Sequence, residues 1–406
     1  MVGYYSIWPT IGVLAAILMA AATPLFRAAD SPPIPARQRV GTLDGLRGFL
    51  ALAVFFHHGA LYHTYIQDGL WRPPPDRLYA LLGPFGVAMF FMITGFLFWS
   101  QLIEKQGRPD WVRLYVGRLF RIGPIYLFAV AVMMITVFAW SGGRLQVGLD
   151  TLAMQIARWC ALGLRTGSPL NGVEHPGDLL ANVVWSLRYE WLFYFSLVFT
   201  AFFARDPRTA WAFPALGLAL SLTILVRLDL SGGTPKVSAF IALFCVGMLT
   251  AALRPAVERV DFNRPPFSAG ALGLMLIVLA LFKTAYDAAP ICLLGAAFFL
   301  IANGTSLFGL LTSRPARRLG DVSFGIYLLQ GLILAGLFST QAARDFALAA
   351  PAQHWALVGL AALLLIGAAT LAHVAIERPG VDFGRRVAGL VRPRPAVPAR
   401  SPAPGR

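Results

Sequence analysis

The sequence predicts an all-α fold, a polytopic bundle of transmembrane helices, and three observations support that prediction. Of the 406 residues, 57% are hydrophobic and only 13% are charged, whereas soluble domains carry roughly 25% charged residues. The hydrophobic residues gather into blocks of about 20 residues, the length that a helix needs to cross ~30 Å of hydrocarbon. Arg and Pro concentrate in the joints between these blocks. These features exclude a water-soluble globular domain.

Eleven blocks are expected to span the membrane, at 6–26, 46–66, 83–103, 119–140, 186–204, 210–228, 236–253, 267–285, 290–311, 321–341 and 353–376. No Lys or Arg precedes the first block, and Arg27 follows it, so residues 1–30 are predicted to be a retained helix and not a cleaved signal. Alternate joints carry the basic residues, and the positive-inside rule places those joints in the cytosol. We therefore expect a multi-pass protein of a bacterial inner (cytoplasmic) membrane, with its N-terminus outside and its C-terminus in the cytosol.

The other ten blocks are predicted to form one domain over residues 40–380. Residues 149–165 are apolar enough for a helix, but a further span there would invert every later joint. We expect an interfacial or re-entrant helix instead, within an outer insertion at 141–184. The tail at 386–406 is rich in Arg and Pro and is expected to be disordered in the cytosol.

The charge and the cysteines narrow the set of partners. The net charge is +15, but the basic residues stand singly or in pairs at block ends, so the expected partner is the lipid bilayer and no nucleic acid. Cys160, Cys245 and Cys292 form no CxxC motif, which indicates neither a disulfide framework nor a metal site. The oligomeric state is not determined by the sequence, and a homodimer is one option.

Ionisable side chains inside the expected spans are the candidate functional residues, because burying such groups in lipid is costly. Arg47 and His58 are about three helical turns apart and share a helix face, with Asp44 one turn before Arg47 and His57 pointing elsewhere. The alternative is that Arg47 anchors the helix at the inner interface and that His58 bonds a neighbouring helix. Gly95 in a later span indicates close helix packing.

Two further groups lie near the ends of their spans. Arg118 and Arg121 flank a cytosolic helix entrance and suit a phosphorylated ligand, although the positive-inside rule alone also explains them. Ser186, Glu190 and Tyr194 follow one another at a spacing of four. Counting residues places Glu190 at about the depth of His58, so the two could form a general-base pair; the alternative is a pair between Glu190 and a nearby cation such as Arg188.

Six motifs in the same order resemble the acyltransferase 3 family of integral-membrane, acyl-CoA-dependent acyltransferases. They run across residues 43–379, which is nearly the whole chain apart from the first helix and the tail. They are the LDGLRG motif with Arg47 and His58; Gly86, Val87, Phe90, Phe91, Thr94, Gly95 and Phe96; Arg118, Arg121, Pro124 and Tyr126; Trp185, Ser186, Leu187, Glu190, Phe193 and Tyr194; residues 319–330; and Glu377, Arg378 and Pro379.

The resemblance implies a ten-helix core with both ends in the cytosol. It also implies that His58 and Arg47 are essential to acyl transfer and that Arg118 and Arg121 handle the donor. This sequence departs from the family pattern at two positions: Thr94 stands where Ser is usual, which keeps a hydroxyl, and Gln330 stands where His is frequent, which removes a titratable group.

The predicted function is transfer of an acyl group, expected to be acetyl, from acyl-CoA to a hydroxyl of a cell-surface polysaccharide, a glycolipid or a glycosylated metabolite. The predicted catalytic residues are His58, Arg47 and Glu190. The donor site is assigned to Arg118 and Arg121, and no permanently bound cofactor is expected. An acyl-His intermediate is the variant in which donor and acceptor arrive from opposite sides. The other substrate-contacting candidates are Ser186, Tyr194, Tyr327 and Trp185.

Two other functions fit parts of the pattern. A transporter or flippase for a lipid-linked sugar or an organic anion could use Arg47, His58 and Glu190 as its site, although the sequence lacks the internal repeat of many such folds. A catalytically inactive scaffold is favoured only by Gln330. His373 and His354 are predicted to be packing or interface residues.

Overall fold

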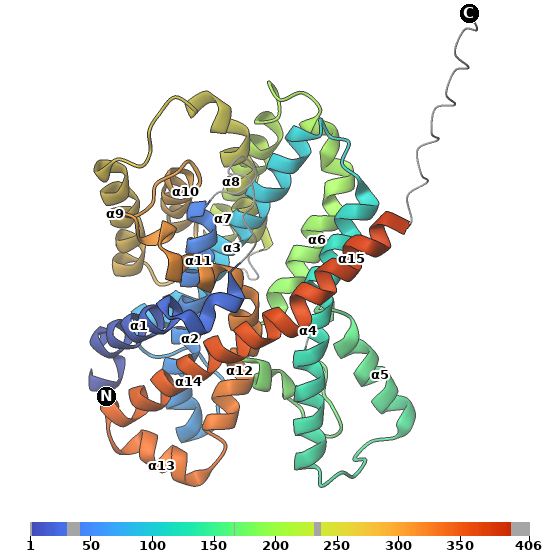
Figure 1. Ribbon diagram of the computed structural model, residues 1–406, viewed down its shortest axis with the longest axis vertical. Coiled ribbons are helices and arrows are strands. Elements are labelled where there is room, and N and C mark those ends of the chain that lie inside the picture. Colours follow the sequence, from blue (N-terminus) through green and yellow to red (C-terminus); the bar gives the residue numbers. More distant parts are fainter. Residues whose placement is uncertain (1, 31–40, 166, 231–236, 391–406) are drawn as a thin grey trace, which may run out of the picture.

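The computed structural model describes residues 2–30, 41–165, 167–230 and 237–390, and within these ranges the chain is helical with no β-strand. Figure 1 shows the helices gathered into one bundle, with α5 at its edge beside α4. The α-helices are α1 (Ile7–Ala22), α2 (Gly41–Asp68), α3 (Arg77–Glu104), α4 (Trp111–Trp140), α5 (Leu149–Cys160), α6 (Trp185–Thr200), α7 (Ala212–Leu230), α8 (Val237–Leu253), α9 (Pro265–Leu281), α10 (Ala288–Ala302), α11 (Arg314–Asp321), α12 (Ser323–Leu337), α13 (Gln341–Ala349), α14 (Pro351–Ala372) and α15 (Arg378–Leu390). The all-α prediction is confirmed.

Each of the eleven expected blocks contains a helix, but not every helix is long and apolar enough to cross a membrane by itself. In the described chain five are, at Gly3–Ala22, Arg77–Glu104, Trp111–Trp140, Val237–Val257 and Pro351–Leu390. A sixth is the pair α11 and α12, which is bent by 69°. Helix α2 is less apolar because it carries Asp44, Arg47 and three histidines. The protein is thus multi-pass, and the number of eleven crossings stays a prediction.

Several predicted boundaries are wrong. The block at 290–311 is not one helix, because α10 ends at Ala302 and a short 3-10 turn forms only at Leu310–Thr312. At the other end of the chain, α14 and α15 join through a π-helical turn at His373–Glu377 and form one rod that crosses the bundle obliquely (Figure 1). Residues 386–390 of the expected disordered tail are therefore helical, and 391–406 lie outside the described residues.

The predicted close approach at Gly95 is confirmed between α3 and α8. A Cβ atom at Gly95 would lie 2.3 Å from the carbonyl oxygen of Phe244, and one at Gly247 would lie 2.0 Å from that of Met92. Both obstacles are backbone atoms, which cannot turn aside as a side chain can. The two glycines therefore let the helices touch along their backbones, the usual role of small residues between membrane helices.

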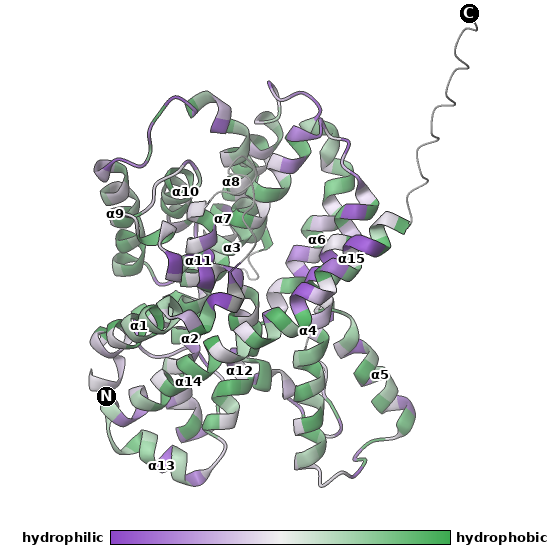
Figure 2. Cartoon of the chain, viewed as in Figure 1, coloured by the Kyte–Doolittle hydropathy of each residue, from purple (hydrophilic) through white to green (hydrophobic). Residues whose placement is uncertain are grey.

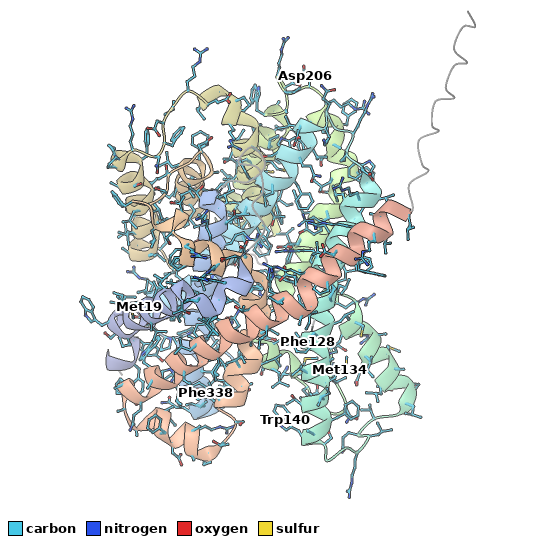
Figure 3. All side chains as sticks on the ribbon, in the orientation of Figure 1. Met19, Phe128, Met134, Trp140, Asp206 and Phe338 are labelled. Carbon is cyan, nitrogen blue, oxygen red and sulfur yellow. The ribbon has the colours of Figure 1, made fainter. Side chains whose placement is uncertain are left out.

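The segments that connect the helices lie at two opposite ends of the bundle. Asp206 lies at one end of the molecule, whereas Trp140 and Phe338 lie toward the other (Figure 3). Helix α5 is also near this second end, and its 12 residues are too few to cross ~30 Å of hydrocarbon at 1.5 Å per residue. The insertion at 141–184 thus contributes a short helix, as expected, and a 3-10 turn at Pro176–Leu180 that packs on α12.

Helix α1 is tied to the rest of the bundle by a buried cation. The guanidinium of Arg318 is only 3% exposed; it donates to the carbonyl oxygens of Ala21 (2.7 Å) and Thr23 (2.8 Å) and to the Asp30 carboxylate (2.5 Å). Arg314 binds the same carboxylate at 3.0 Å. The hydrogen bonds and charges of these two arginines lower the pKa of Asp30 to about 2. The end of the N-terminal helix is therefore fixed to α11.

Candidate active site

A cavity of about 1420 Å³ lies between α2, α3, α4, α6, α12 and α15. It is larger than the roughly 300–1,000 Å³ of a typical small-molecule pocket. Hydrophilic residues concentrate around α11 and where α15 crosses α4, while apolar residues cover most of the long helices (Figure 2). Polar side chains from these helices line the cavity.

Basic side chains line the cavity from its edge inward. Half-buried Arg47, Arg118 and Arg121 lie inside, whereas the exposed cations are Lys105, Arg108, Arg113, Arg254 and Arg385. Fewer carboxylates line it, namely Asp44, Glu104, Asp110, Glu190 and Asp321. The excess of positive charge favours an anionic ligand, and the guanidinium groups suit phosphate in particular. The structure thus brings Arg118 and Arg121, the predicted donor-binding residues, into one cavity with Arg47.

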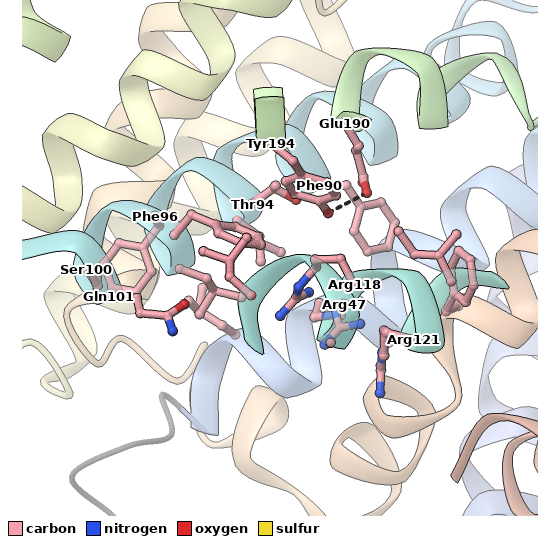
Figure 4. A pocket seen from close by; sticks show the side chains of 18 of the residues that line it. Arg47, Phe90, Thr94, Phe96, Ser100, Gln101, Arg118, Arg121, Glu190 and Tyr194 are labelled. Carbon is pink, nitrogen blue, oxygen red and sulfur yellow. Dashed lines mark hydrogen bonds between the residues drawn. The ribbon is translucent and has the colours of Figure 1, made fainter. Parts of the chain in front are cut away.

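Glu190 and Tyr194 face the arginines across the cavity (Figure 4). They lie one turn apart on α6, and the Tyr194 hydroxyl donates to Glu190 Oε2 at 2.9 Å. Arg118 and Arg47 lie near enough to attract the Glu190 carboxylate. Arg118 also stacks on the Phe98 ring, with its guanidinium carbon 4.7 Å from the ring centre. Packing against a ring fixes the direction of an otherwise flexible cation.

A second ionic group lies where the π-helical turn reaches the cavity. Glu377 is fully buried; its Oε1 is 2.8 Å from an amino group of Arg121, and its Oε2 is 2.9 Å from Nδ1 of His373. Arg378 Nε donates to His373 Nε2 at 3.0 Å. His373 itself lines the cavity, so the prediction that it is a packing residue missed this role. The spacing of four between His373 and Glu377 was the available signal.

His58 does not line the cavity. It is 7% exposed, and its Nδ1 lies 2.9 Å from the Val54 carbonyl oxygen and 3.3 Å from Gln330 Oε1. Both partners are acceptors, which favours a proton on Nδ1 and a lone pair on Nε2, and the Ala181 backbone is a further partner of the ring. His57 instead contacts the Tyr79 carbonyl oxygen at 2.8 Å.

One sequence prediction about the site is wrong, and the predicted substrate contact of Trp185 stays a prediction. Glu190 does not orient His58, since its partner is Tyr194 and the partners of His58 are Gln330 and the backbone. Counting residues gave a similar depth for both side chains but could not tell which way each one turns. Trp185 is not among the cavity-lining residues and packs on Phe240, with ring centres 5.5 Å apart.

Ser186 and Tyr327 close one part of the cavity wall. The Tyr327 hydroxyl donates to the Val183 carbonyl oxygen at 3.0 Å, and the Ser186 hydroxyl oxygen lies 2.9 Å from the Tyr327 hydroxyl oxygen. One turn along α12, Gln330 reaches back with its amide to the Tyr327 carbonyl oxygen at 2.7 Å. Helix α12 therefore faces the cavity through Tyr327 and faces His58 through Gln330.

Comparisons with known proteins agree with this picture. A family model described as an acyltransferase domain, that of the acyltransferase 3 family, matches residues 40–373. The exopolysaccharide production protein ExoZ of Rhizobium meliloti (strain 1021) is 28% identical over 319 residues, which cover 75% of this chain and 91% of that protein. No solved structure matches the chain. Because the family model covers most of the sequence and begins one residue before α2, the chain belongs to the acyltransferase 3 family and is an acyltransferase.

Proposed function

We propose that this acyltransferase moves an acyl group, expected to be acetyl, from acyl-CoA to a hydroxyl group of a cell-surface polysaccharide, a glycolipid or a glycosylated metabolite. The observation that carries the proposal is the large basic cavity, which leads from exposed cations to Arg47 in a chain of an acyltransferase family. A bacterial inner membrane, with the cavity mouth on the cytosolic side, would give the enzyme access to cytosolic acyl-CoA.

The donor would bind with its phosphates among the arginines. Coenzyme A is a polyanion with a long uncharged arm. The cavity offers cations for the phosphates and apolar side chains for the arm. The exposed cations would attract the phosphates, and Arg118 and Arg121 would bind them with directed hydrogen bonds. The apolar residues Phe90, Val87 and Leu187 then offer a path for the arm toward Tyr327.

The acceptor is inferred from the relative. The Rhizobium meliloti protein is named for exopolysaccharide production, which supports a polysaccharide hydroxyl over the other two acceptor classes. Such an acceptor would arrive from the outer end of the bundle, on the side of the 3-10 turn at Pro176–Leu180.

The proposed reaction is direct transfer with His58 as general base. Nε2 of His58 takes the proton of the acceptor hydroxyl, and the oxygen attacks the thioester carbon. A C–O bond forms, the C–S bond breaks, and the CoA thiolate leaves with the proton that the imidazolium returns. Tyr327 or Ser186 would stabilise the oxyanion that forms between these steps. The acyl end would have to pass Tyr327 to meet His58, because Tyr327 lines the cavity and Gln330, about one turn further along the same side of α12, contacts that imidazole.

Substitution of the two predicted essential residues tests this function. His58→Ala and Arg47→Ala should abolish acyl transfer in membranes while the amount of folded protein stays unchanged. His57→Ala should be tolerated, since that ring makes its contact with a backbone oxygen on α3. Normal product formation by both His58→Ala and Arg47→Ala would rule the mechanism out.

Release of CoA separates the enzyme from the transporter alternative. A transporter that uses Arg47, His58 and Glu190 would move its substrate and leave the thioester intact. Purified protein incubated with labelled acetyl-CoA should release CoA, slowly without acceptor and faster with it. Uptake of a substrate into proteoliposomes without CoA release would favour transport.

A further inference from the structure

We propose that Gln330 is the positioning residue for His58: its side-chain oxygen holds the proton on Nδ1 and thereby leaves Nε2 free to act as the base. The proposal rests on the proposed role of His58. In the sequence, Gln330 stood out only because the family often has His at this position. Its contact with His58 joins α2 to α12 and links residues that are 272 positions apart.

The orientation of the Gln330 amide follows from its own contacts. Gln330 is fully buried, and its Nε2 donates to the Tyr327 carbonyl oxygen at 2.7 Å. The reversed amide would set two oxygens against each other at that distance, so the nitrogen must face Tyr327 and the oxygen must face His58. The 3.3 Å contact is therefore one in which the imidazole donates.

The tautomer of His58 then follows from the acceptors at Nδ1. Gln330 Oε1 and the Val54 carbonyl oxygen both face Nδ1, and neither can donate to it, while the Ala181 backbone is a further partner of the ring. Two acceptors at one nitrogen favour the tautomer with the proton on Nδ1 and the lone pair on Nε2. A neutral amide can impose this arrangement without taking or giving up a proton of its own, unlike a titratable partner.

The backbone next to Gln330 is held in place by the outer insertion. A Cβ atom at Gly331 would lie 2.3 Å from the Ala181 amide nitrogen and 2.5 Å from the Leu180 carbonyl carbon. The 3-10 turn at Pro176–Leu180 thus packs directly against α12, next to the contact between Gln330 and His58. This packing limits any movement of Gln330 away from the imidazole.

The test compares two substitutions at Gln330 with one control. Gln330→Met keeps the size but removes one of the two acceptors at Nδ1, and because the Val54 carbonyl oxygen remains, kcat/KM should fall by on the order of tenfold, a small part of the ~10²–10⁴ that a general base supplies. Gln330→Glu restores the acceptor, and a proton on its other carboxyl oxygen replaces the amide in donating to the Tyr327 carbonyl oxygen. Its activity should therefore exceed that of Gln330→Met, and this recovery should shrink as the pH rises and the carboxyl ionises. Gln353→Met, in the neighbouring helix α14, should change neither the rate nor its dependence on pH.

The outcomes are distinguishable from those that test the function itself. Wild-type activity in folded Gln330→Met, or equal losses in both variants at every pH, would overturn the positioning role while inactive His58→Ala leaves the base assignment intact. Full activity of His58→Ala would instead remove the base and this proposal with it. If one Gln330 variant does not accumulate, the other still decides, since each has its own readout.

Discussion

Replacing Arg118 with alanine should weaken CoA binding far more than replacing Arg108. Arg118 is half-buried inside the cavity and stacks on Phe98, so its direction is set before a ligand arrives. Arg108 is exposed at the edge of the same cavity. The two side chains carry equal charge, and the difference between them isolates the effect of burial and fixed orientation.

The magnitudes follow from these environments. A hydrogen bond to a charged partner in a protected site contributes about 1.5–3 kcal/mol, which is roughly tenfold to a hundredfold in the dissociation constant. An exposed ion pair contributes about 0.2–1 kcal/mol, less than about fivefold. Arg118→Lys should fall between these limits, because it keeps the charge and loses the planar fork that binds phosphate.

Isothermal titration of CoA into the detergent-solubilised protein measures these constants directly. Raising the salt concentration should reduce the contribution of Arg108 to CoA affinity more than that of Arg118, since exposed charges are screened more strongly than buried ones. Equal effects of Arg118→Ala and Arg108→Ala, or unchanged affinity in Arg118→Ala, would refute the placement of the donor phosphates at the inner arginines.

Three further predictions concern stability. Glu377→Gln should destabilise the protein by about 1–3 kcal/mol, because it leaves Arg121 beside a neutral amide in a buried site; an unchanged melting temperature would contradict this. Gly247→Ala should cost about 1–3 kcal/mol, since its Cβ would lie 2.0 Å from a backbone oxygen of α3, whereas Gly273→Ala, with nothing within 4 Å, should be neutral or stabilising in the same thermal melt. Asp30, whose pKa is lowered to about 2, contributes stability that is full above its unfolded pKa of about 3.9 and is lost as the pH falls through about 2. Asp30→Asn should therefore lower the melting temperature clearly at pH 7 and much less near pH 2, and an equal difference at both pH values would contradict the ion pair.

Much of the bundle was predictable because hydrophobic length and charge in the joints are local properties. The same local signals singled out Arg118 and Arg121, although α4 begins at Trp111 and carries them two to three turns inside the helix and not at its entrance. The close helix approach predicted at Gly95 was also found, because a small residue in an apolar helix has few other uses. Local rules thus located the helices and the arginines that line the cavity.

The partner of His58 could not be predicted in this way. Residue counting gives the height of a side chain along a helix, but the direction it faces depends on how α2, α6 and α12 pack. Glu190 turned toward Tyr194 and the arginines, and Gln330 took the place beside His58.

His373 was missed for a different reason. Its apolar neighbours in α14 suggest a packed helix face, and only the π-helical turn brings His373 and Glu377 to Arg121 in the cavity. Such turns add a residue to one helical turn and shift the register of the helix beyond it. The sequence shows His373 and Glu377 four residues apart, but it does not show that this helix face lies beside the proposed donor cavity.

The most direct measurement incubates the purified protein with radiolabelled acetyl-CoA and a deacylated exopolysaccharide, beside His58→Ala protein of equal melting temperature. Wild-type protein should move the label to the polysaccharide as an alkali-labile ester and release an equal amount of CoA, while the variant does neither. Release of CoA and labelling of the polysaccharide no greater than with the variant, over a range of acyl donors and acceptors, would contradict the proposed acyl transfer.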